Sequence, residues 1–372
     1  MPYRLRPHIR EMAPYSPGKP VEEVQRELGL KSVVKLASNE NPFGPSPRAL
    51  EAVRLAAASM NVYPDASGRR LRDALAVRYG LKSDQVMLGN GSDGLVHNLG
   101  LVFLGSPDDE VVVGDPSFVR YDASAHLAPC RLVKVPLDRQ WRHELKAMAA
   151  ALSDRTKLVY IANPNNPTGT IVPETEVRAL IRDLPPGCPL VLDEAYFEFA
   201  ADVPGYPDGA RLLSEGLPVV VLRTFSKAYG LAGLRVGYGF ADAEIVDSID
   251  RVREPFGVRA LAQEGALAAL DDSAHVADSV RRNREGLRLI ADSAVEAGFG
   301  GVESHANFVC IDLGRPCRPV FEALLRLGVI VRPCDIFGMP NHIRVSVGTE
   351  AETQVYLEAF RRVVLASQEV PA

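Results

Sequence analysis

Paired cysteines, tryptophan and long apolar runs are scarce in this chain of 372 residues, which has five cysteines and one tryptophan. The cysteines are odd in number and none is spaced as C-x-x-C, so neither a disulfide framework nor a zinc site is indicated. No apolar run approaches the roughly 18 residues of a membrane-spanning helix, and the basic N-terminus lacks the apolar segment of a secretory signal. We therefore expect reduced thiols, a cytoplasmic location and no membrane partner.

The chain also has no large excess of positive or negative charge. The chain has 42 Lys and Arg against 47 Asp and Glu, a net charge of −5, which gives no reason to expect a nucleic-acid partner. Hydrophobic residues make up 47% and charged residues 24%, as in ordinary globular proteins, which excludes a disordered chain or a coiled coil. The seven histidines show no metal-binding spacing such as H-E-x-x-H, so no metal is expected.

Short apolar runs alternate with helical patterns over the middle of the chain. The seven runs are residues 86–88, 111–113, 132–135, 158–161, 190–192, 219–222 and 236–239. Continuous rather than alternating runs are typical of strands covered on both faces. The pattern predicts an α/β fold: a large domain with a mostly parallel seven-stranded sheet at 41–270, and a smaller α/β C-terminal domain at 271–372. Residues 1–40 are expected to form an N-terminal arm and part of the small domain.

Chemically distinctive residues follow these runs, where ligands of open α/β sheets bind. The small residues at 89–94 precede a helical pattern and suit either phosphate binding or a tight connection. Phe118 is either a stacking residue or a core residue, and Asp193 is either a paired carboxylate or a helix N-cap. Lys227 lies between two buried strands, where other positive charge would depress its pKa and favour an amine nucleophile over a surface lysine.

Together, these strand ends resemble the class I and II aminotransferases of fold type I, which use pyridoxal 5'-phosphate. The resemblance covers nearly the whole chain, with five motifs in the family's order and approximate spacing. It implies that Lys227 binds the cofactor covalently, that Asp193 holds the pyridine nitrogen protonated, and that Tyr196 completes the catalytic set. The other implied cofactor-binding residues are Phe118 and Asn166 at the ring, and Ser92, Asp93, Thr224, Ser226 and Arg235 at the phosphate. Tyr121 is expected to support Asp193.

Within this family the chain is most similar to the histidinol-phosphate aminotransferases, through residues 36–47, 63–65, 89–93 and 342–348. The likeness implies that Tyr63 reaches the cofactor phosphate of a neighbouring subunit, and hence a homodimer with shared active sites. The implied substrate-binding residues are Arg344, Arg332, Tyr15 and Asn39. Gly94 and Arg259 depart from the pattern, where Glu and Asn are more usual, and the second departure bears on the substrate.

The implied reaction exchanges the amino group of L-histidinol phosphate with 2-oxoglutarate, a step of histidine biosynthesis. An aromatic or broad-range amino-acid aminotransferase would use the same residues and remains the alternative. A threonine-phosphate decarboxylase would also keep the lysine and the phosphate pocket. A cofactor-binding regulatory module is disfavoured, because 372 residues leave no room for a DNA-binding domain beside this fold.

Overall fold

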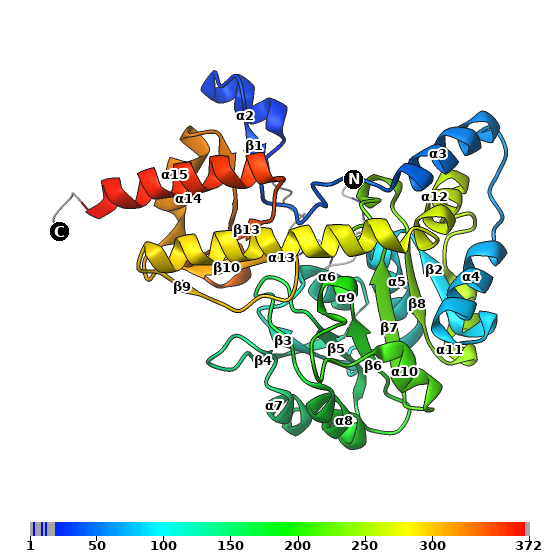
Figure 1. The fold of residues 1–372 in the computed structure, drawn as a ribbon. Helices are drawn as coiled ribbons and strands as arrows, with labels where there is room; N and C mark the ends of the chain where they lie inside the picture. Colours follow the sequence, from blue (N-terminus) through cyan, green and yellow to red (C-terminus); the bar gives the residue numbers. More distant parts are fainter. Residues whose placement is uncertain (1–2, 4–8, 10–11, 13–18, 129, 369–372) are drawn as a thin grey trace.

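A seven-stranded sheet in the order β2-β8-β7-β6-β5-β3-β4 is the centre of the larger part of the computed structural model, which describes residues 3, 9, 12, 19–128 and 130–368 (Figure 1). The strands are β2 (Val86–Gly89), β3 (Glu110–Asp115), β4 (Arg131–Pro136), β5 (Thr156–Ala162), β6 (Leu190–Asp193), β7 (Val219–Thr224) and β8 (Gly237–Phe240). β8 is antiparallel to both neighbours, whereas the other adjacent pairs are parallel. All seven predicted runs form strands, so the predicted fold class is confirmed.

Helices cover both faces of this sheet, which explains why its strands are apolar without alternation. In β6, for example, Leu190 and Leu192 pack into the apolar cluster on one face and Val191 into the cluster on the other. The helices packed on the first face are α4 (Arg69–Tyr79), α7 (Leu145–Ala150), α8 (Glu174–Asp183), α10 (Gly209–Ser214) and α12 (Ala260–Leu270). The opposite face carries α5 (Gly91–Phe103), α6 (Val119–Leu127) and α11 (Ala243–Val252). Two further helices, α3 (Pro47–Ala56) and α9 (Phe197–Ala200), complete this part.

A second apolar core lies in the smaller part of the molecule. Its four-stranded sheet has the order β12 (Arg332–Pro333), β13 (His342–Ser346), β10 (Phe308–Asp312) and β9 (Gly300–Gly301). A separate parallel pair joins β1 (Val34–Lys35) to β11 (Val329–Ile330), so the N-terminal segment packs with the C-terminal elements. The helices here are α2 (Val21–Leu28), α14 (Cys317–Arg326) and α15 (Glu350–Gln368). The long helix α13 (Ser273–Glu296) runs across the junction of the two parts (Figure 1).

The sequence at residues 329–332 predicts a single strand, but the structure has two: β11 ends at Ile330 and pairs with β1, whereas β12 begins at Arg332 and pairs with β13. Through this second pairing, Arg332 is the register partner of Arg344. Within the described ranges, no helix is both long and apolar enough to cross a membrane.

Candidate active site

The carboxyl ends of β6 and β7 place an acid and an amine on the same edge of the large sheet. Asp193 is the last residue of β6, and Lys227 follows β7 by three residues. Each influences the other electrostatically, since the Lys227 charge lowers the pKa of Asp193. The parallel pairing of β6 with β7 therefore brings together two predicted residues that lie 34 positions apart.

Asp193 is a buried carboxylate held by two donors. The Tyr121 hydroxyl donates to Oδ2 at 2.7 Å and the Ala195 backbone N–H donates to Oδ1 at 3.2 Å. Burial raises the pKa of Asp193 to about 6, and the Tyr121 bond opposes that rise. The carboxylate is therefore oriented and anionic near neutral pH, and a cation beside it would stabilise it further.

The Lys227 amine has a depressed proton affinity. Its Nζ donates to the backbone oxygen of Asn39 at 3.1 Å. Burial lowers the pKa of Lys227 to about 8, the Arg344 charge lowers it further, and Asp93 and Glu40 oppose the change. An appreciable fraction of the amine is neutral at pH 7 to 8, which is the form that attacks a carbonyl carbon or accepts a proton.

The start of α5 forms a cradle in which only glycine fits at two positions. A Cβ on Gly237 would lie 2.5 Å from the backbone of Gly91 and of Ser92, and a Cβ on Gly91 would lie 2.6 Å from Nη2 of Arg235. The first turn of a helix has unpaired N–H groups that attract anions. Ser92 and Asp93 lie in that turn, and the Arg235 guanidinium reaches it, since its Nη2 lies 3.4 Å from Asp93 Oδ2.

Two hydroxyls line the same cradle, Thr224 from the last position of β7 and Ser226 from the loop that follows. The Ser226 backbone N–H donates to Thr224 Oγ1 at 3.1 Å, and Thr224 Oγ1 donates to Ser226 Oγ at 3.0 Å. Arg235 Nη1 also donates to Ser226 Oγ, at 3.4 Å. Arg259, the departure noted above, donates to Asn90 Oδ1 at 3.4 Å, and Asn90 is the N-cap residue that precedes α5.

Asn39 connects the amine to a tyrosine and to the small sheet. It is buried, with the backbone in the left-handed region at φ 55°. Its Nδ2 donates to the Tyr196 hydroxyl oxygen at 2.9 Å, and its Oδ1 accepts from Ser346 Oγ at 2.8 Å. The Asn307 amide donates to the Asn39 backbone oxygen at 3.0 Å. Both polar atoms of the Asn39 side chain therefore have a hydrogen-bond partner within the protein: Tyr196 for Nδ2 and Ser346 for Oδ1.

Two arginines are paired across neighbouring strands of the small sheet. Arg332 and Arg344 are register partners on β12 and β13, and their guanidinium carbons lie 5.9 and 5.8 Å from the centre of the Phe337 ring. Arg344 is buried and donates to Asn166 Oδ1 and, at 3.0 Å, to the backbone oxygen of Ala37. Its Nε is buried without a partner among the described residues. This pair could bind an anionic group.

Three predicted residues lie outside this hydrogen-bonded group or outside the described residues. The Phe118 ring contacts Tyr121 edge to face at 5.6 Å and packs against the apolar cluster that contains Tyr121, so its predicted stacking role stays a prediction. Tyr63 is exposed and stacks on Phe256 at 4.7 Å, so its predicted contact with a neighbouring subunit stays a prediction. Tyr15 lies outside the described residues.

Ser346 and Asn307 belong to the site but were not predicted from the sequence. Both touch Asn39, one through its side chain and one through its backbone. The sequence did contain a signal for Ser346: it follows Arg344 by two residues on a predicted strand, so the two side chains lie on the same face of that strand. Asn307 directly precedes β10 and has no such signal.

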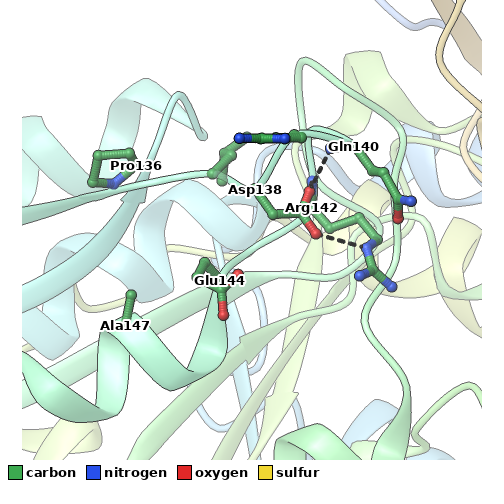
Figure 2. A pocket seen from close by; sticks show the side chains of 8 residues that line it. Pro136, Asp138, Gln140, Arg142, Glu144 and Ala147 are labelled. Atoms are coloured by element: carbon green, nitrogen blue, oxygen red, sulfur yellow. Dashed lines mark hydrogen bonds and ion pairs between the residues drawn. The ribbon is translucent and has the colours of Figure 1, made fainter.

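An open hollow of about 610 Å³ beside β4 is separate from this group. It is lined by residues 136–140, 142, 144 and 147, none of which was predicted to have a functional role. Figure 2 shows that Asp138 accepts from the backbone of Gln140 and from the Arg142 side chain, so its charge is used within the loop. The described residues contain no group of three or more His, Cys, Asp or Glu arranged to hold a metal.

Comparison with known proteins gives the same family throughout. The profile of the family described as aminotransferase class I and II matches residues 31–360. The chain is 46% identical over 362 residues to the histidinol-phosphate aminotransferase of Moorella thermoacetica, covering 97% of this chain and 93% of that protein. It is 47% identical over 358 residues to that of Symbiobacterium thermophilum, covering 96% and 98%.

Solved structures with the same fold include a relative with the cofactor bound. The histidinol-phosphate aminotransferase of Sinorhizobium meliloti in complex with pyridoxal-5'-phosphate superposes with a TM-score of 0.90 at 30% identity, covering 98% of each chain. The aspartate aminotransferase of Thermus thermophilus with maleate gives a TM-score of 0.85 at 25% identity, covering 97% of this chain and all of that one (100%).

Proposed function

The chain belongs to the class I and II aminotransferase family, and from that premise we propose that it is a histidinol-phosphate transaminase. It exchanges the amino group of L-histidinol phosphate with 2-oxoglutarate, giving imidazole acetol phosphate and glutamate, with pyridoxal 5'-phosphate as cofactor. This reaction belongs to histidine biosynthesis. The observation that carries the proposal is the convergence of Lys227, Asp193 and Arg344 from three separate elements on one group of contacts.

The residues present fit this cofactor at both of its ends. The glycine cradle at the start of α5, with Arg235 over it, suits a phosphate dianion. Asp193 is anionic and buried, and among the described residues no cationic side chain forms an ion pair with it. A protonated pyridine nitrogen would supply that missing cation. We propose Tyr196 and Asn166 as the donors to the ring oxygen; Asn166 accepts from Arg344 through Oδ1, and the Tyr196 hydroxyl oxygen accepts from Asn39.

Lys227, Asp193 and Arg344 have distinct tasks in the proposed reaction. When bound, pyridoxal phosphate supplies an aldehyde that takes up the amino group and a ring that takes up electrons from the substrate carbon. The Lys227 amine would hold the cofactor, and as a free amine it would accept the proton of the substrate carbon. The Asp193 carboxylate holds a proton on the ring nitrogen. Arg344 orients the anionic group of the substrate, so that the carbon to be deprotonated faces Nζ.

The substrate-binding residues are proposed from the same contacts. Glutamate offers an α-carboxylate to Arg344, whereas histidinol phosphate offers a phosphate, for which the neighbouring Arg332 adds a second guanidinium. Tyr15 is proposed to lie over the substrate. Asn39 is proposed to bind substrate from its position beside Lys227, whose Nζ donates to the Asn39 backbone oxygen.

A homodimer with shared active sites is part of the proposal. Large apolar side chains are exposed along one segment of the large part: Leu50, Leu55, Met60, Val62 and Tyr63. Exposed apolar patches of this kind mark association surfaces. Tyr63 then reaches the cofactor phosphate of the second subunit. We also propose a cytoplasmic location, supported by the five free thiols, and domain boundaries at residues 40 and 270, supported by the separate apolar cores.

The direct test follows the visible spectrum of the cofactor-loaded protein after addition of L-histidinol phosphate. Parallel samples receive phenylalanine or phosphothreonine. The proposal expects conversion of the yellow cofactor to its pyridoxamine form to be fastest with histidinol phosphate. Faster conversion with phenylalanine would make the protein an aromatic aminotransferase, and release of carbon dioxide from phosphothreonine would make it a decarboxylase. Failure to take up pyridoxal phosphate would overturn the proposed chemistry.

A further inference from the structure

The Ser346 hydroxyl makes two hydrogen bonds to one residue. It accepts from the Asn39 backbone N–H at 3.0 Å and donates to Asn39 Oδ1 at 2.8 Å. The Asn39 amide nitrogen in turn donates to the Tyr196 hydroxyl oxygen at 2.9 Å. Ser346, Asn39 and Tyr196 are 3%, 2% and 4% exposed, so water does not compete for these bonds. They come from β13, the segment after β1, and the loop after β6.

This arrangement fixes which way the Asn39 amide points. A hydroxyl has one proton, and the Ser346 oxygen already accepts from a backbone N–H, so its proton goes to Oδ1. The amide nitrogen must then face Tyr196. The Tyr196 oxygen accepts that bond and keeps its own proton for another acceptor. With the amide reversed, Oδ1 would accept the Tyr196 proton, and the phenol would lose its ability to donate elsewhere.

We propose that Ser346 is a positioning residue for transamination. By orienting the Asn39 amide, it keeps the Tyr196 hydroxyl a donor toward the ring oxygen of the cofactor. The inference rests on the proposed function, because it takes Tyr196 as that donor. It assigns to the small sheet a role in setting the electronic state of a ring held by the large domain.

The charged groups around Tyr196 do not set the direction in which its hydroxyl donates. Lys227 Nζ lies 5.6 Å from the centre of the Tyr196 ring, Arg344 faces it from β13, and Asp193 faces it from β6. Burial raises the pKa of Tyr196 to about 12, while Arg344 and the Asn39 bond lower it, so the phenol is protonated at neutral pH. None of these charged groups selects the direction of the phenol proton, whereas the amide does.

The test is the pH titration of the visible absorption of the cofactor-loaded enzyme, with Ser346→Ala as the main variant. Donation to the ring oxygen stabilises its negative charge, so weaker donation raises the pKa of the Lys227–cofactor chromophore. We expect a rise of about half a unit to one unit and a fall in kcat of about five- to tenfold, with KM changed less than twofold. Ser346→Thr keeps the hydroxyl and restores both values.

Two controls separate this role from general destabilisation. Ser293→Ala removes a buried hydroxyl of the small domain, one that donates to the Ile290 oxygen at 2.7 Å, and leaves the titration unchanged. In a Tyr196→Phe background, Ser346→Ala causes no further shift, because the phenol through which it acts is gone. Ser346→Cys, which fills the space with a weaker donor, gives an intermediate shift and serves if the alanine variant does not fold.

The outcomes distinguish this inference from the proposed function. An unchanged titration in Ser346→Ala, or an equal shift with and without the Tyr196 hydroxyl, overturns the role of Ser346 whatever the substrate. A shift that depends on Tyr196, in an enzyme inactive toward histidinol phosphate, supports the role of Ser346 and overturns the substrate assignment alone. A protein that takes up no pyridoxal phosphate overturns both.

Discussion

The depressed pKa of Lys227 predicts how fast the cofactor-free protein captures pyridoxal phosphate at different pH values. Only the neutral amine attacks the aldehyde. With a pKa of about 8, roughly one-eleventh of the amine is neutral at pH 7 and roughly ten-elevenths at pH 9. Capture should therefore accelerate about tenfold over this interval and reach a plateau near pH 9. An ordinary lysine, with a pKa near 10.4, would accelerate about a hundredfold with no plateau.

Stopped-flow mixing of cofactor-free protein with pyridoxal phosphate, followed by absorbance, measures this rate. The phosphate group of the cofactor titrates near pH 6 and does not interfere above pH 7. Lys227→Ala supplies the background from surface lysines. Arg344→Gln removes a charge that lowers the pKa of Lys227, so its plateau should move to higher pH. A capture rate that keeps rising in proportion to hydroxide through pH 10 would refute the argument that burial and Arg344 depress this amine.

Three further predictions concern the charges and glycines around the site. Asp193→Asn should lower kcat about 10²- to 10³-fold, without lowering the thermal unfolding temperature, because burial disfavours the charge it removes. Turnover and melting, measured together, check this, and a destabilised but active variant would contradict it. Burial raises the pKa of Glu194 to about 7, so its stability test is made at about pH 8.5, where Glu194 is ionised. Glu194→Gln removes one of the two carboxylates that lie 2.7 Å from the fully buried Arg223 guanidinium and leaves only Asp208, which should cost about 2 kcal/mol in denaturant unfolding; an unchanged midpoint would contradict it. Gly237→Ala should weaken pyridoxal phosphate binding at least about tenfold in a titration, because its Cβ would displace the start of α5. Gly233→Ala, with nothing within 4 Å of its Cβ, is the matched control, and equal affinities in the two variants would count against the cradle.

The strands and the residues that follow them were predictable because the signals are local. Leu190, Val191 and Leu192 are buried on both faces of the sheet, and a continuous apolar run is what that environment requires. Parallel strands end at the same edge, so Asp193 and the loop of Lys227 had to meet once β6 paired with β7.

The contacts of Asn39 were not predictable in the same way. Its partners Ser346 and Tyr196 are 307 and 157 residues away, and no local pattern specifies such pairs. Its positive φ is uncommon for a residue other than glycine and is held by bonds from Asn307 and Ser346. The division of residues 329–332 into two strands also depends on partners distant in the sequence, because β11 pairs with β1 whereas β12 pairs with β13.

In the proposed reaction, Arg344 links substrate binding to the chemistry of the amine. It belongs to the small sheet, yet its charge is the strongest single cause, after burial, of the lowered pKa of Lys227. An anionic substrate group that pairs with Arg344 neutralises part of that charge. The proton affinity of the Lys227 amine then rises while the substrate is in place, when the amine must accept a proton from the substrate carbon. In the proposed reaction, the same guanidinium therefore increases the neutral fraction of the amine for cofactor capture, and its neutralisation by bound substrate makes the amine a stronger base.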